Sequence, residues 1–155
     1  MTTTTPPARA LCALLLPLLA GCASGGGEPH REVIAPEGTR IEGLPFAPAV
    51  RTGDLIFISG QVGNLPGTRE IVPGGVGPET RQTLENMRVV LAAAGGTRQD
   101  VVKCTVFLVD MRDYEAMNEV YAAFFGSSPP ARSTVAGSGL ALGARVEIEC
   151  IAAGR

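Results

Sequence analysis

The sequence predicts one α+β domain in which two helices cover one face of a mixed β-sheet. The chain has 155 residues, of which 45% are hydrophobic and 18% are charged, and this composition is typical of a single globular domain with a substantial core. Two segments carry apolar residues at spacings of three and four, which indicates helices. The other apolar segments are short and rich in β-branched residues. Their order is strands, helix, strand, helix, strands.

The N-terminal segment is predicted to be a targeting signal. Arg9 precedes a mostly apolar run, residues 10–20, which is long enough for a secretory signal and too short to span a bilayer. The run ends in Leu-Ala-Gly-Cys at residues 19–22, which resembles the lipobox of bacterial lipoproteins. The alternative is an ordinary signal peptide cut near Ala20. A lipobox predicts that Cys22 becomes the first residue and carries lipid.

This interpretation divides the chain into a signal peptide, residues 1–21, a flexible tether, residues 22–30, and a domain, residues 31–155. The lipid would be the membrane contact of an otherwise soluble domain. Ala23 follows the cysteine where aspartate would favour retention in the inner membrane. We therefore expect a lipid-anchored protein of the cell envelope, at the outer membrane and facing the periplasm.

The domain is expected to begin with strands. Residues 31–34 predict a short strand, and residues 47–50 and 55–59 predict two strands of a hairpin. Residues 60–77 are rich in glycine and proline, which predicts an irregular loop with a short strand near residues 71–72. The first helix should start near Pro78 and stop at Gly95. Its apolar stripe, which we assign to the core, comprises Leu84, Met87, Leu91 and Ala94.

The second half repeats the alternation of strand and helix. Residues 101–109 predict a strand, and a helix capped by Asp110 or Asp113 follows and ends at Gly126. Pro129 and Pro130 prevent the helix from resuming. The last predicted strands are residues 133–136 and residues 144–153.

Charge and cysteine usage exclude several classes of function. The net charge is -2 and basic residues do not cluster, so no nucleic-acid partner is expected. No residues have the spacing of metal ligands, and the one histidine, His30, lies in the tether. Cys104 and Cys150 each lie within a predicted strand. We expect two buried thiols there, although an oxidising periplasm would also permit a disulfide.

The last predicted strand alternates apolar and acidic residues. The alternation puts Glu147 and Glu149 on the face opposite the apolar residues. Either this is a solvated face, or one carboxylate acts as a base beside a cation that binds a substrate carboxylate. Arg132, directly after the two prolines and one alanine, is the nearest candidate cation.

Several sequence blocks in order resemble the RidA/YjgF family of enamine/imine deaminases. They read GDLIFISGQ at residues 53–61, QTLEN at 82–86, VKCTVFL at 102–108, MNEVYAAFF at 117–125, PARS at 130–133 and VEIECIA at 146–152. The resemblance extends from about Val33 to the C-terminus. It implies a chorismate-mutase-like single domain with a six-stranded sheet, and a homotrimer with ligand clefts between subunits.

The resemblance also implies the chemistry. Arg132 would bind the carboxylate of a small 2-imino acid, and Glu147 would activate water for attack on the imine carbon, with release of ammonia and with no cofactor. Ser59 and Gly60 would offer backbone contacts to the ligand, and Asn118 would lie near the cleft.

Two positions depart from the family pattern. Phe46 stands where deaminases of this family usually carry tyrosine, and Thr134 stands where a cysteine is common. Two hypotheses follow: hydrolysis of reactive 2-imino acids and enamines, or a non-catalytic module of the envelope that binds small carboxylates or acts as a chaperone. The presence of both Arg132 and Glu147 favours the enzyme, since a pure binder needs only the cation.

Overall fold

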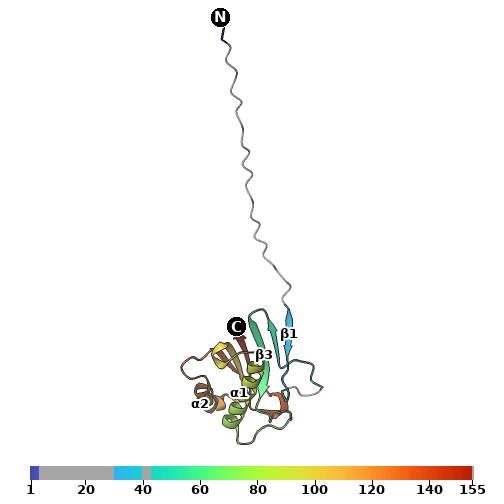
Figure 1. Ribbon diagram of the computed structural model, residues 1–155. Helices are drawn as coiled ribbons and strands as arrows, with labels where there is room; N and C mark the ends of the chain where they lie inside the picture. The colour runs from blue at the N-terminus through green and yellow to red at the C-terminus, as the bar shows by residue number, and fades with distance from the viewer. Residues whose placement is uncertain (4–29, 40–42, 155) are drawn as a thin grey trace.

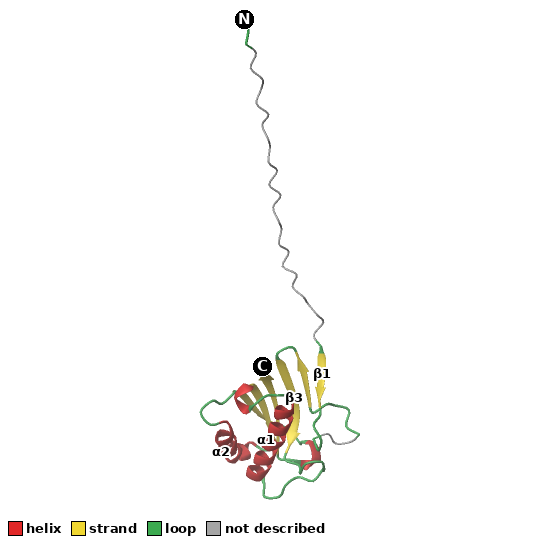
Figure 2. Ribbon diagram, viewed as in Figure 1, coloured by secondary structure: helices red, strands yellow, loops and turns green. Residues whose placement is uncertain are grey.

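The computed structural model describes residues 1–3, 30–39 and 43–154. It has two layers, a six-stranded mixed sheet and two helices packed on one of its faces (Figures 1 and 2). The predicted α+β class is confirmed. The predicted signal peptide, the lipid-bearing Cys22 and nearly all of the tether lie outside the described residues. Within the described ranges, no helix has the length and apolar character needed to cross a membrane.

The sheet follows the order β1-β2-β3-β6-β4-β5. The strands are β1 (Arg31–Ile34), β2 (Ala49–Thr52), β3 (Leu55–Val62), β4 (Val101–Leu108), β5 (Ala131–Ala136) and β6 (Val146–Ala153). β4 and β5 are parallel because a helix connects them, whereas the other neighbouring pairs are antiparallel. The short strand predicted near residues 71–72 is a single bridge between Asn64 and Ile71.

Helix α1 (Val76–Ala93) begins two residues earlier than the sequence predicted, directly after Gly75. Pro78 still lies within the first turn, where its missing N–H has no cost. The helix ends just before Gly95, whose φ of 75° suits a residue without a Cβ.

Of the two caps predicted for helix α2 (Tyr114–Phe125), only Asp110 makes a capping hydrogen bond. Asp110 accepts a hydrogen bond from the Arg112 N–H and so caps a short 3₁₀ helix, while Asp113 occupies the N-cap position of α2 itself. Gly126 ends the helix as predicted.

The two faces of the sheet differ in chemistry. Cys104, Val106 and Leu108 of β4 are buried, as are the apolar residues of β6 that alternate with Glu147 and Glu149. The open face carries both glutamates. It also exposes large apolar side chains, namely those of Val33, Leu55, Phe57 and Val135.

Cys104 and Cys150 form a disulfide, so the prediction of two buried thiols was wrong. The antiparallel register of β4 and β6 sets the two residues directly opposite each other, with their Cα atoms 4.1 Å apart. Facing cysteines at this separation are within bonding range. The sequence predicted both strands, but their pairing register depends on the whole sheet.

Candidate functional site

Arg132 lies on the helix-covered side of the edge strand β5. The parallel register pairs it with buried Cys104, so its side chain turns toward α2. Its Nη1 donates to Asn118 Oδ1 at 2.7 Å and its Nη2 donates to Tyr114 Oη at 3.0 Å. The Tyr121 ring lies 4.6 Å below Cζ as a cation–π partner. The guanidinium is therefore held in one orientation by neutral groups.

No carboxylate of the described residues forms an ion pair with Arg132, so its positive charge is uncompensated there. Thr134 lies two residues further along the same face, and its buried hydroxyl has no hydrogen-bond partner among the described residues. The Tyr121 hydroxyl is in the same situation, and burial raises the pKa of Tyr121 to about 12 against the opposing effect of Arg132. We call these residues the cation half-site: Tyr114, Asn118, Tyr121, Arg132 and Thr134.

Glu147 lies on the open face of β6, opposite Phe107 of β4. It is half-buried, and this burial, followed by the repulsion of Glu149, raises the pKa of its carboxyl. The β3 register shifts between Ile58 and Gln61, which brings Gly60 against the carboxylate. A Cβ at position 60 would overlap Glu147 Oε1. A side chain at residue 60 would therefore force the Glu147 carboxylate to move.

A cavity of about 300 Å³ opens beside Glu147 and Gly60, and Phe46 lines it. We call these three residues and the cavity the carboxylate half-site. Ser59 does not line this cavity. Its hydroxyl donates to the Ala47 carbonyl at 2.7 Å and its N–H to the Pro48 carbonyl at 3.0 Å, so it holds the loop that carries Phe46.

A single chain does not bring Arg132 and Glu147 together. The two side chains leave opposite faces of the sheet, and β4 lies between their strands. Arg132 lies on the strand that precedes β6 in the sequence, but β6 pairs with β3 and β4 rather than with β5.

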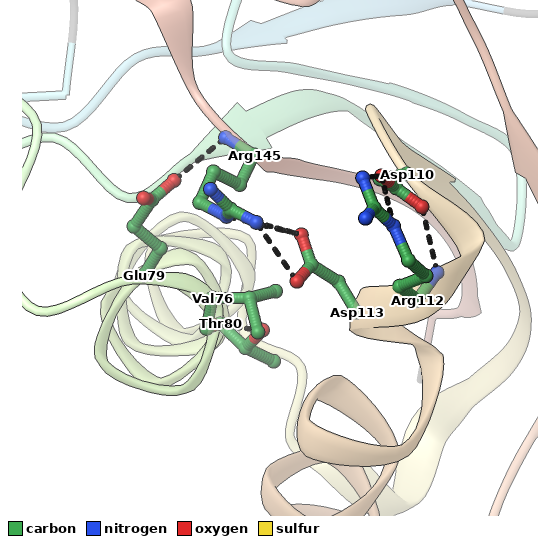
Figure 3. A network of polar contacts seen from close by, with 7 residues as sticks. All are labelled: Val76, Glu79, Thr80, Asp110, Arg112, Asp113 and Arg145. Atoms are coloured by element: carbon green, nitrogen blue, oxygen red, sulfur yellow. Dashed lines mark hydrogen bonds and ion pairs between the residues drawn. The ribbon is translucent and has the colours of Figure 1, made fainter.

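A polar network anchors the start of β6 to both helices (Figure 3). The buried Glu79 carboxylate in the first turn of α1 accepts a hydrogen bond from the Arg145 N–H at 2.7 Å. The Arg145 guanidinium donates to both oxygens of Asp113, at 3.0 and 2.9 Å. Asp113 immediately precedes α2, and Arg145 lies two residues before Glu147. The network therefore fixes the start of β6, which carries Glu147, and the start of α2, which carries Tyr114 and Asn118.

The sequence missed two residues of the cation half-site, Tyr114 and Tyr121. The sequence did contain a signal for these two residues. Tyr114, Asn118 and Tyr121 are separated by four and then three residues, so their side chains share one face of α2. Among the described residues, no cluster of histidine, cysteine or acidic side chains could hold a metal ion.

Comparison with known proteins gives consistent matches. Residues 40–154 match the family model described as Endoribonuclease L-PSP. A RutC family protein of Pyrococcus horikoshii is 46% identical over 122 residues, which cover 79% of this chain and 97% of that protein. A Mus musculus protein named 2-iminobutanoate/2-iminopropanoate deaminase is 46% identical over 108 residues, 70% of this chain and 80% of that one. The crystal structure of Escherichia coli TdcF with bound serine superposes with a TM-score of 0.74 at 35% identity, covering 80% of this chain and 99% of that one.

Proposed function

Because this chain belongs to the Endoribonuclease L-PSP family, we propose that it hydrolyses reactive 2-imino acids and their enamine tautomers to 2-oxo acids and ammonia. The observation that carries the proposal is Arg132, a guanidinium oriented by Tyr114 and Asn118 and lacking an acidic partner among the described residues. Such a planar fork suits the carboxylate of an α-substituted acid. The bound serine of the TdcF structure is an acid of this type.

Glu147 supplies the base in the proposed reaction. A water oxygen bonds to the imine carbon while Glu147 takes one water proton, and Glu147 passes that proton to the imine nitrogen. Glu147 then moves the hydroxyl proton of this adduct to its amino nitrogen, the C–N bond breaks, ammonia leaves, and the oxygen forms the C=O of the 2-oxo acid. A raised carboxyl pKa makes Glu147 a stronger base than an exposed glutamate. Arg132 orients the substrate and lowers the entropic barrier.

The complete site is proposed to form between two copies of the chain in a homotrimer. Arg132 and Glu147 lie on opposite faces of one sheet, so a cleft containing both must take each from a different subunit. The exposed apolar side chains of the open face also favour its burial against a second copy.

Ammonia release from freshly generated 2-iminopropanoate tests the chemistry. Glu147→Gln and Arg132→Ala should each abolish the enzymatic rate, and Arg132→Lys should not restore it because the bidentate fork is lost. Equal rates in wild type and these variants would remove the enzyme proposal. Carboxylate binding without turnover in the wild type would favour the binding-module hypothesis.

Mixed assemblies test the shared cleft. Arg132→Ala and Glu147→Gln chains are each inactive alone, but an equal co-assembled mixture should recover about one cleft in four, since each cleft draws its two residues from different chains. The double variant co-assembled with Arg132→Ala is the control and should stay inactive. Failure of complementation in verified mixed assemblies would mean that no intersubunit site exists.

We further propose that the protein is a lipoprotein of the cell envelope. The Leu-Ala-Gly-Cys ending of the apolar segment supports this, and so does the disulfide, because disulfides persist in oxidising compartments. Cys22→Ser should abolish lipidation and release the protein from the membrane fraction. Unlipidated wild-type protein in the cytoplasm would refute this location.

A further inference from the structure

The Cys104–Cys150 disulfide and Arg132 form one row across three neighbouring strands. Cys150 of β6 lies opposite Cys104 of β4, and Cys104 is also the register partner of Arg132 on β5. Register partners on neighbouring strands turn their side chains to the same face, and the strands lie about 4.8 Å apart. The bond therefore joins the strand that carries Glu147 to the strand against which Arg132 is placed.

The two ends of this row are held differently. Beyond Cys150 the row continues with Ile58 of β3 and Ala49 of β2, and both residues are buried. At the other end β5 is an edge strand that pairs with β4 alone. A change in the width of the row is therefore taken up at β5, where the fewest contacts oppose it.

Reduction of the disulfide would widen the row, because unbonded sulfur atoms do not stay at bonding distance. Nonbonded heavy atoms rest about 3.5–4.0 Å apart. Both cysteines belong to the buried core, which they share with Tyr121, and close packing leaves two thiols no free volume there. The separated sulfurs would press toward β5 and toward the Tyr121 ring, which is the cation–π partner of Arg132.

The orientation of Arg132 is sensitive to such a displacement. Its hydrogen bonds to Asn118 Oδ1 and Tyr114 Oη, of 2.7 and 3.0 Å, both cross from β5 to α2. An N–H···O bond is normally no longer than about 3.2 Å, so a movement of β5 by about 1 Å would break both. The guanidinium would then lose the fixed position that the proposed binding of a carboxylate requires.

We propose that the redox state of the Cys104–Cys150 pair controls substrate affinity: the disulfide holds Arg132 in place for the substrate carboxylate, and the dithiol form displaces it. The inference rests on the proposed function for the identity of the ligand. When the disulfide forms, two thiols give up two protons and two electrons to the disulfide of an oxidant, which becomes a dithiol. Both cysteines are buried after folding, so the redox state is set while the chain folds. Folding in an oxidising compartment gives the high-affinity form.

The two redox states of one chain test this control. The Cys12→Ser/Cys22→Ser variant of the full chain keeps Cys104 and Cys150 as its only cysteines. It is refolded with oxidised or with reduced dithiothreitol, and ammonia release from 2-iminopropanoate is measured with catalase present to remove peroxide from the oxidase that generates the imine. Reduction should raise KM at least about tenfold, because a misplacement of about 1 Å can cost a hundredfold, and should leave kcat within about twofold. A purely structural bond would instead lower the active fraction, and so the apparent kcat, at constant KM.

Binding without turnover separates this inference from the proposed function. Calorimetric titration with 2-oxobutanoate, a small 2-oxo acid, should give a dissociation constant about tenfold higher in the reduced form. That difference without ammonia release in either form would overturn the proposed function and leave this inference standing.

The control is the same chain with Cys104→Ala and Cys150→Ala added, in which reductant should change neither KM nor the dissociation constant. Equal affinities in the folded oxidised and reduced forms would overturn the inference and leave the proposed function intact. A reduced chain that does not fold would overturn the inference too, because the bond would then control folding rather than affinity.

Discussion

Loss of the Cys104–Cys150 disulfide is expected to destabilise the protein strongly. The bond closes a loop whose ends are 46 residues apart in the sequence. In the chain-entropy model a loop of this length restricts the unfolded state enough to stabilise the fold by about 4 kcal/mol. A domain of this size has a total free energy of unfolding of only about 5–15 kcal/mol, so the melting temperature should fall by roughly 15 °C without the bond.

Comparison of the oxidised wild type with the wild type refolded in strong reductant isolates the bond, since both states contain the same sulfur atoms. Urea unfolding is followed by far-ultraviolet circular dichroism, because the chain contains no tryptophan. Protein concentration must be held fixed, since assembly also shifts apparent stability. The Cys104→Ala/Cys150→Ala variant is the control: reductant should not change its midpoint.

Two results would refute this reasoning. One is a wild-type midpoint that is the same with and without reductant. The other is a peptide map of the purified, unreduced protein in which the Cys104 and Cys150 peptides are not linked. Either would mean that the facing cysteines contribute through packing alone.

Two further predictions concern the half-sites. Tyr114→Phe removes one hydrogen bond to the Arg132 guanidinium and should raise KM roughly fivefold with kcat nearly unchanged. Tyr121→Phe is the control and should leave KM unchanged, because it removes a hydroxyl without a partner among the described residues. Equal effects of the two variants on KM would contradict this prediction. Glu149→Gln removes a charge that raises the Glu147 pKa, so the pH at which kcat/KM falls on acidification should become lower. Glu32→Gln on β1 is the control and should leave this pH unchanged. The same pH dependence of kcat/KM in Glu149→Gln and wild type would contradict the coupling.

Local patterns predicted most of the fold because each depends on neighbours in the sequence. The Asp110 cap of the 3₁₀ helix before α2 and the alternation of β6 are examples, since a cap or a strand face is set within a few residues. The start of α1 was misplaced because Pro78 is also tolerated within the first turn. The disulfide was missed because it depends on the pairing register of β4 and β6, which local patterns do not specify.

The candidate site was predictable in composition but not in arrangement. Arg132 and Glu147 were identified from the sequence, yet their positions on opposite faces follow from the strand order, in which β4 separates β5 from β6. Ser59 was expected to offer backbone contacts to a ligand, and that contact stays a prediction. Its N–H and hydroxyl bond the Ala47–Pro48 segment. These hydrogen bonds form only when the loop is folded, and the sequence offers no signal for them.

The network around Arg145 joins the two half-sites mechanically. Arg145 starts the segment that leads to Glu147, and its guanidinium binds Asp113 at the start of the helix that carries Tyr114 and Asn118. If a cleft takes its cation from one chain and its base from another, each chain serves two clefts, one through each half-site. A displacement of α2 by a ligand at the cation half-site would then pull on β6 through a short, bidentate contact. In that arrangement the Arg145–Asp113 contact would link the two half-sites of each chain, and through them two clefts.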